Sequence, residues 1–131
     1  RVLARDAYLY VPEVKIGLNL QWGALPRLVT LVGPARAKRI VLLCEKMGAE
    51  QALDWGLVDE LAGPGGALAK ALELARTAAS MPAATTRMVK QAVNATANAL
   101  HHVSAFADAD QSALTRTYRD AMAAREAFAK R

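Results

Sequence analysis

The stretch VPEVKIGLNLQWGALPRL, residues 11–28, joins an apolar segment to a predicted helix through a turn rich in glycine and amide side chains. Directly after Pro12 comes a carboxylate, Glu13, which is either a solvated charge at a strand end or a functional group in a site. The flanking sequence is apolar on both sides, so we expect the Glu13 side chain to be partly desolvated. A desolvated carboxylate is suited to general acid or base chemistry.

The turn after Glu13 carries side chains that suit a pocket around this carboxylate. Leu20 and Trp22 are candidates for an apolar wall, and Gln21 is a candidate for a hydrogen-bonding group within it. The alternative for Trp22 is that its indole packs beneath the following helix. From the residues alone, a structural and a functional interpretation of Glu13 both remain open.

The segments around this stretch predict a few strands followed by helices. Residues 1–16 carry the β-like signals VLA, AYLYV and EVKI. Apolar residues then recur at helical spacing, which predicts a helix from about Ala24, with Pro26 in its first turn, to a stop at Gly33. The other predicted elements are helices at 34–44, 49–55, 67–80, 83–100 and over the last 25 or so residues, and a short strand at Leu57 and Val58. This order is typical of the end of a larger α/β or α+β fold.

The composition narrows the class of protein. The 131 residues are 53% hydrophobic and 22% charged, as in a globular domain rather than a disordered chain. No apolar run approaches the roughly 20 residues of a membrane span, so we expect no membrane segment. A single cysteine, Cys44, excludes an intrachain disulfide and fits a reducing cytoplasm. The 17 basic residues exceed the 12 acidic ones but are dispersed, which does not favour a nucleic-acid surface.

Several kinds of site lack the residues that they require. Cys44 with the adjacent His101 and His102 does not have the paired spacing of a zinc site, so we expect no metal. Cys44 falls on an apolar helical face without a nucleophile-elbow motif, which predicts a buried, inert thiol. The glycine-rich segment at 63–66 lacks the lysine and hydroxyl side chains of a phosphate-binding loop.

The ordered motifs PEVKIGL, ALPRLVTLVGPARAKRIVLL and GAEQALDWGLVDEL resemble the crotonase superfamily, which includes enoyl-CoA hydratases and isomerases. The ending AFAKR is similar to the family's C-terminus, so the resemblance covers essentially the whole chain. It implies an α/β fragment of the ClpP/crotonase spiral, made of the last core strands and the C-terminal helical region. Residues 1–62 would be the end of the spiral core with the active-site loop, and residues 63–131 the helical region that covers CoA and forms oligomer contacts.

The resemblance also implies a function. It suggests an enoyl-CoA hydratase or isomerase that acts on an acyl-CoA thioester through an enolate-type intermediate. Glu13 matches the catalytic glutamate of the family, and Phe128 and Arg131 match positions that approach CoA. Coenzyme A would arrive as part of the substrate, with no permanently bound cofactor. The expected assembly is a homotrimer or a dimer of trimers.

The sequence departs from the family pattern in ways that bear on activity. Leu20–Leu25 replaces a run of small residues, with Gln21 where some relatives carry Asp, and Lys130 stands where Glu is usual. The resemblance places the oxyanion hole and a second glutamate in an N-terminal half upstream of Arg1. Backbone donors of that kind contribute about 3–4 kcal/mol each to transition-state binding, so this chain alone should be nearly inactive.

The alternative to an enzyme is a non-catalytic helical assembly module or a degenerate homologue. In an assembly module, Glu13 would be fully exposed or paired with a basic side chain.

Overall fold

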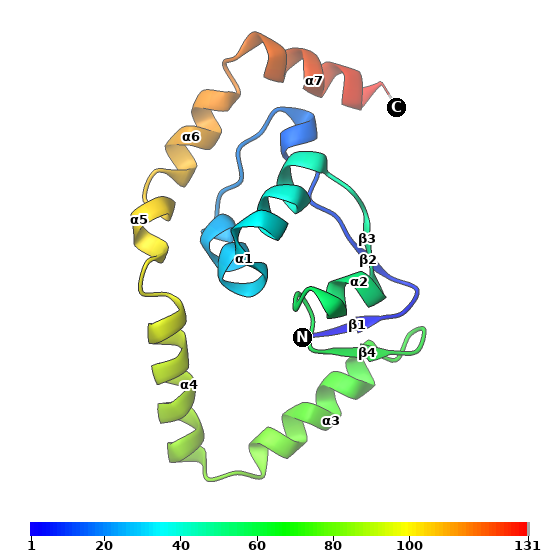
Figure 1. Cartoon of the computed structure of the whole chain (residues 1–131), viewed down its shortest axis with the longest axis vertical. Helices are drawn as coiled ribbons and strands as arrows, with labels where there is room; N and C mark the ends of the chain where they lie inside the picture. The colour runs from blue at the N-terminus through cyan, green and yellow to red at the C-terminus, as the bar shows by residue number, and fades with distance from the viewer. Residues whose placement is uncertain (131) are drawn as a thin grey trace. The chain divides into compact units, whose positions relative to one another are not determined.

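The computed structural model describes residues 1–130, and most of them are helical (Figure 1). The chain forms two compact units, each built from separate stretches of sequence. Unit 1 consists of residues 1–9 and 47–99, and unit 2 consists of residues 10–46 and the chain from Leu100 onward. No helix in the described part of the chain combines the length and apolar character that a membrane span requires.

Unit 1 holds two short strand pairs. Strand β1 (Val2–Ala4) runs parallel to β4 (Glu60–Ala62), with Leu3 opposite Leu61. Strand β2 (Tyr8–Leu9) pairs antiparallel with β3 (Met47–Gly48). The short helix α2 (Ala49–Asp54) follows β3 and contributes buried alanines to the small core of this unit. The predicted strands VLA and AYLYV and the predicted helix at 49–55 are thus confirmed.

Two further helices complete unit 1. They are α3 (Ala67–Ala79) and α4 (Ala83–Ala97), which are separated by Pro82, as the sequence predicted. Neither helix has a buried residue, and their apolar side chains remain exposed. Helices in proteins gain most of their stability from packing of an apolar face. The exposed apolar side chains of α3 and α4 therefore lack that stabilisation within the described chain.

Unit 2 combines one short 3-10 helix with four α-helices. These are η1 (Val14–Ile16), α1 (Ala24–Leu43), α5 (His101–Ala105), α6 (Asp108–Thr115) and α7 (Arg119–Ala129). Helix α1 begins at Ala24, as predicted, and Gly33 interrupts it with φ 77° and ψ 164°. Only glycine readily adopts that conformation, which explains the predicted stop at Gly33 and the new start at Pro34. Cys44 is buried, as its apolar helical face predicted.

Three expectations for the elements are wrong. EVKI is a 3-10 turn rather than a strand, because Gly17 adopts a left-handed conformation with φ 70° and its N–H donates to the Val14 carbonyl at 3.0 Å. The strand expected at Leu57 and Val58 lies further along, at β4, and Val58 is buried instead. The C-terminal region consists of α5, α6 and α7 in succession rather than one continuous helix.

The expected division assigned residues 1–62 to the spiral core of a complete fold and residues 63–131 to its helical region. This division stays a prediction. The two compact units divide the chain differently, because the segments of the two units alternate along the sequence. The stretch that decides the fold, residues 11–28, lies wholly in unit 2. Its partners in that unit, α6 and α7, come from the C-terminal part of the chain.

Candidate functional site

Glu13 lies at the N-cap position of η1, with φ −54° and ψ −48°. Its backbone carbonyl accepts hydrogen bonds from the N–H groups of Ile16, at 3.1 Å, and Leu18, at 2.8 Å. The side chain is half-buried, and its Oε2 atom is buried without a hydrogen-bond partner among residues 1–130. A buried carboxylate oxygen without a partner is costly, and such groups occur where a ligand or reacting group completes the site.

The turn after Glu13 is fixed against helix α7. Gly17 approaches Ala121 so closely that a Cβ atom on Gly17 would lie 2.4 Å from the Ala121 Cα atom. Ala121 itself is buried, so α7 has no room to move aside there without loss of packing. The close contact between these two small residues sets the path of the chain that leaves Glu13.

Helix α6 holds the next part of the loop through three hydrogen bonds. The Asn19 side-chain amide donates to Gln111 Oε1 at 2.9 Å, and the Asn19 backbone N–H donates to Thr115 Oγ1 at 3.3 Å. The Gly23 backbone N–H donates to Asp108 Oδ2 at 3.0 Å. Asp108, Gln111 and Thr115 are three and four residues apart, so they lie on one face of the helix. We call this set of α6 side chains the α6 clamp.

The predicted pocket residues, which lie between the two ends of the clamped loop, differ in how far they are buried. Leu20 is only 5% exposed and belongs to the core of unit 2. Gln21 is half-buried, and its backbone carbonyl accepts from the Ala24 N–H at 3.3 Å. Trp22 is 70% exposed, with a left-handed φ of 66°. The indole therefore does not pack beneath the following helix.

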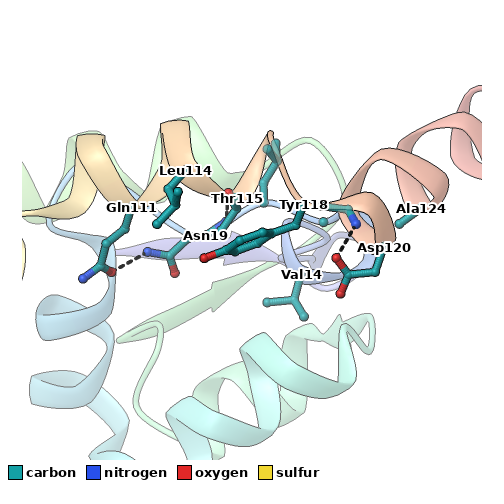
Figure 2. A pocket seen from close by; sticks show the side chains of 11 residues that line it. Val14, Asn19, Gln111, Leu114, Thr115, Tyr118, Asp120 and Ala124 are labelled. Atoms are coloured by element: carbon teal, nitrogen blue, oxygen red, sulfur yellow. Dashed lines mark hydrogen bonds between the residues drawn. The ribbon is translucent and has the colours of Figure 1, made fainter.

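A cavity of about 500 Å³ lies in unit 2 (Figure 2). It is bounded by η1, the loop after it, α6 and α7. The Asn19–Gln111 hydrogen bond lies at one end and Asp120, which accepts the Ala121 N–H at 2.8 Å, lies toward the other. The residues that line it are Val14, Gly17, Leu18, Asn19, Gln111, Leu114, Thr115, Tyr118, Asp120, Ala121 and Ala124.

Glu13 and the three predicted pocket residues are not among the residues that line this cavity. Instead, α6 and α7 supply half of the wall, and the sequence analysis missed their polar side chains. A signal for two of them existed, since Gln111 and Thr115 are four residues apart, the spacing of one helix face, in a segment otherwise rich in alanine. The mixed wall suits a ligand with both apolar and hydrogen-bonding parts.

The predicted CoA-binding residues lie at the end of α7 or beyond it. Phe128, in the last turn of α7, is 45% exposed, and Arg131 lies outside the described residues. Among residues 1–130 there is no group of three or more side chains that could hold a metal ion. The clearest electrostatic perturbation is in unit 1, where a hydrogen bond from the Arg1 guanidinium holds the pKa of Asp59 well below its usual range.

Comparison with known proteins places this geometry in a family. A family model described as "Enoyl-CoA hydratase/isomerase" matches residues 1–130. The chain belongs to the enoyl-CoA hydratase/isomerase family. A short-chain-enoyl-CoA hydratase of Clostridium acetobutylicum is 31% identical over 94 residues, which cover 72% of this chain and 36% of that protein. A carnitinyl-CoA dehydratase of Escherichia coli strain K12 is 35% identical over 75 residues, 57% of this chain and 29% of that protein.

Solved structures of this enoyl-CoA hydratase/isomerase family share the fold. A crystal structure of an enoyl-CoA hydratase from Mycobacterium avium subsp. paratuberculosis K-10 superposes with a TM-score of 0.89 at 26% identity, covering 98% of this chain and 52% of that one. The predicted crotonase-like fold is thus confirmed. The chain spans about half the length of that solved structure, and its matched segments span about a third of those two curated relatives.

Proposed function

We propose that the complete protein is an enoyl-CoA hydratase or isomerase in which Glu13 transfers the proton. The observation that carries this proposal is the buried Oε2 atom of Glu13, which lacks a partner in the part of the chain that the structure describes. The family membership supports the same conclusion, because relatives over this segment include a short-chain-enoyl-CoA hydratase. The substrate would be an acyl-CoA thioester, and CoA would enter and leave with it.

The chemistry requires little beyond a well-placed carboxylate and an oxyanion site. The thioester carbonyl acidifies the α-protons, so a carboxylate can remove or deliver a proton there while hydrogen-bond donors stabilise the enolate oxygen. Glu13 would supply the carboxylate. We further propose that the oxyanion donors and a second glutamate belong to a preceding half of the fold, so that residues 1–131 alone have little activity.

The proposed CoA site uses the end of α7. Phe128 exposes nearly half of its side chain there, which leaves a ring face available to the adenine, and Arg131 would meet the phosphates. The net charge of +5 favours an anionic substrate in general. We also propose a homotrimer or a dimer of trimers, since both Phe128 and the apolar side chains of α3 and α4 are accessible in the single chain.

The second candidate is a non-catalytic helical assembly module or a degenerate homologue. The exposed apolar side chains of α3 and α4 favour it, because such faces serve assembly. That interpretation expects a Glu13 side chain that is fully exposed or paired with a basic group. The half-buried Glu13 side chain and its unpartnered Oε2 atom support the enzyme interpretation instead.

The test is Glu13→Gln in the complete protein, with an enoyl-CoA substrate. We expect kcat to fall by about 100-fold or more, the usual contribution of a general acid or base. The amide has nearly the same shape as the carboxylate, so the melting temperature should stay close to that of the wild type. The matched control is Glu73→Gln, which makes the same change at an exposed position on α3. A Glu13→Gln enzyme as active as this control would falsify the proposal.

A further inference from the structure

We propose that Asp108 is a positioning residue, which sets the acyl-chain preference by holding the loop that carries Trp22. This inference rests on the proposed function, because it concerns the substrate of that same site. It comes from the α6 clamp, whose three hydrogen bonds grip the loop at Asn19 and at Gly23. Trp22 lies inside the gripped segment, next to Gly23.

The Asp108 carboxylate binds a backbone group of a different helix from its own. Its side chain belongs to the first turn of α6 but is directed to the beginning of a different helix, α1. The residue is only 7% exposed, and burial of a carboxylate is unfavourable unless hydrogen bonds compensate. The hydrogen bond from the Gly23 N–H therefore compensates the burial of the Asp108 carboxylate and also anchors the loop at Gly23.

Gly23 is the N-cap residue of α1, and no side chain of its own helix caps that end. The first N–H groups of a helix lack intrahelical partners, and the helix dipole favours a negative charge there. Asp108 supplies both an acceptor and a charge at this end. The carboxylate thereby fixes the position at which α1 begins relative to α6.

The loop conformation needs such an anchor. Trp22 and Gly23 are consecutive residues with left-handed φ values of 66° and 62°. A tryptophan in that region is uncommon, and such backbone persists only where the surroundings hold it. The indole makes little contact that would hold it, since Trp22 is mostly exposed. Its direction is therefore set by the backbone, and hence by the clamp.

We expect that removal of the clamp changes the acyl-chain preference of the enzyme but does not abolish its catalytic activity. With Gly23 free, Trp22 can relax to negative φ, which redirects the indole. If Trp22 forms part of the apolar wall of the acyl site, as its position in the sequence predicts, this bulky side chain limits the length of the acyl chain. A released loop should accept longer chains, and the proton transfer by Glu13 should continue.

The experiment uses Asp108→Ala in the complete protein, with Asp110→Ala as the matched control on an exposed position of the same helix. Hydrogen exchange of the Gly23 amide reports the clamp directly. A hydrogen bond to a buried charged group is strong enough that its loss should accelerate exchange by about tenfold or more. Asp108→Asn keeps an acceptor oxygen, so its exchange should lie between those of the wild type and Asp108→Ala. The control should exchange like the wild type.

The second readout is the ratio of kcat/KM for a twelve-carbon over a four-carbon enoyl-CoA. We expect Asp108→Ala to raise this ratio about fivefold or more and to have no further effect in a Trp22→Ala background, as a double-mutant cycle measures. An unchanged ratio, or an equal rise without Trp22, overturns the inference. If Asp108→Ala does not fold, Thr115→Val, which is isosteric, must instead accelerate exchange at Asn19 and raise the ratio.

These outcomes separate the inference from the proposed function. If the complete protein converts neither thioester, or if Glu13→Gln is fully active, the proposed function fails, and the specificity claim fails with it. If the enzyme is active and depends on Glu13 but the ratio does not respond to Asp108, only the positioning inference fails. Unchanged exchange at Gly23 in Asp108→Ala overturns the clamp itself, whatever the activity.

Discussion

Gly17 and Ala121 are in backbone contact, so that a Cβ atom at Gly17 would lie 2.4 Å from the Ala121 Cα atom and 2.8 Å from its carbonyl oxygen. No real Cβ atom tolerates such distances. The contact joins the turn after Glu13 to the first turn of α7, two segments more than 100 positions apart in the sequence. Gly17 also has φ +70°, so both space and backbone conformation require glycine.

Gly17→Ala should destabilise the protein strongly. A left-handed alanine and an overpacked backbone contact each cost about 1–3 kcal/mol, so we expect the free energy of unfolding to fall by about 2–6 kcal/mol. Denaturant unfolding of the complete protein measures this change.

Two matched glycines separate the steric cost from the cost of the backbone conformation. Gly33→Ala has the left-handed φ but open space around it, and Gly63→Ala has open space and no such φ. The expected order of cost is Gly17, then Gly33, then Gly63, and any other order contradicts the steric argument.

Trp22→Ala should broaden the range of acyl chains. If the exposed indole limits chain length, its removal should raise kcat/KM for a twelve-carbon enoyl-CoA relative to a four-carbon one. Each methylene that gains an apolar contact contributes about 0.8 kcal/mol, so even two additional methylenes predict a change of about tenfold. Steady-state kinetics of the wild type and of Trp22→Ala with both substrates measure the ratio. A wild-type enzyme that already uses the longer substrate as well as the shorter one would show that Trp22 does not restrict it.

Asp59→Asn should reduce stability at neutral pH but not at low pH. The Arg1 guanidinium donates to both Asp59 oxygens, from Nη2 at 2.8 Å and from Nε at 3.0 Å, which lowers the pKa of Asp59 in the folded protein. The stabilisation is therefore full above the unfolded pKa of about 3.9 and disappears as the pH falls toward the folded value. Both side chains are about half exposed, so the effect at pH 7 should be at most about 1 kcal/mol. In melting curves from pH 7 to pH 3, the difference between wild type and Asp59→Asn should be constant down to about pH 5 and then shrink toward the acid end, and exposed Asp54→Asn is the control.

The C-terminal helices should form contacts between subunits or with the rest of the complete fold. Phe106 is 82% exposed, and Leu114, Tyr118 and Met122 are also exposed in the single chain. We expect the complete protein to sediment as a trimer or a dimer of trimers at micromolar concentration. Phe106→Glu should shift the distribution toward smaller species, whereas Arg119→Glu, a charge change at another exposed position, should not. Sedimentation of the wild type as a monomer would remove the intersubunit interpretation.

The sequence predicted the helices well because their signals are local. Gly33–Pro34 and Met81–Pro82 each mark a helix boundary through the backbone of the residues themselves, and both boundaries are present. The failure at EVKI has the opposite cause. Its alternating pattern suits a strand, but the left-handed Gly17 and the contact with Ala121 impose a 3-10 turn. That contact involves a residue far along the chain, which a local pattern cannot contain.

The candidate site was only partly predictable for the same reason. A partly desolvated Glu13 followed from its apolar neighbours in the sequence, and the side chain is half-buried. The partners of the loop did not follow, because Asp108 and Gln111 lie 85 and 92 residues away from the groups that they bind. The role of Trp22 as a pocket wall stays a prediction. Its exposure and its left-handed backbone were not predicted, and the residue after it is bound by the distant Asp108 side chain.

The separation of 85 residues between Gly23 and Asp108 has a consequence for synthesis of the chain. At about 5–20 residues per second, the ribosome adds Asp108 roughly 4 to 17 seconds after Gly23. A local helix forms within microseconds, so α1 is able to form early, but its N-terminal loop has no carboxylate to bind during that interval. We expect the loop to lack its fixed conformation during that interval and to be open to chaperones. Nascent chains arrested before and after residue 108 should differ in how strongly they bind them.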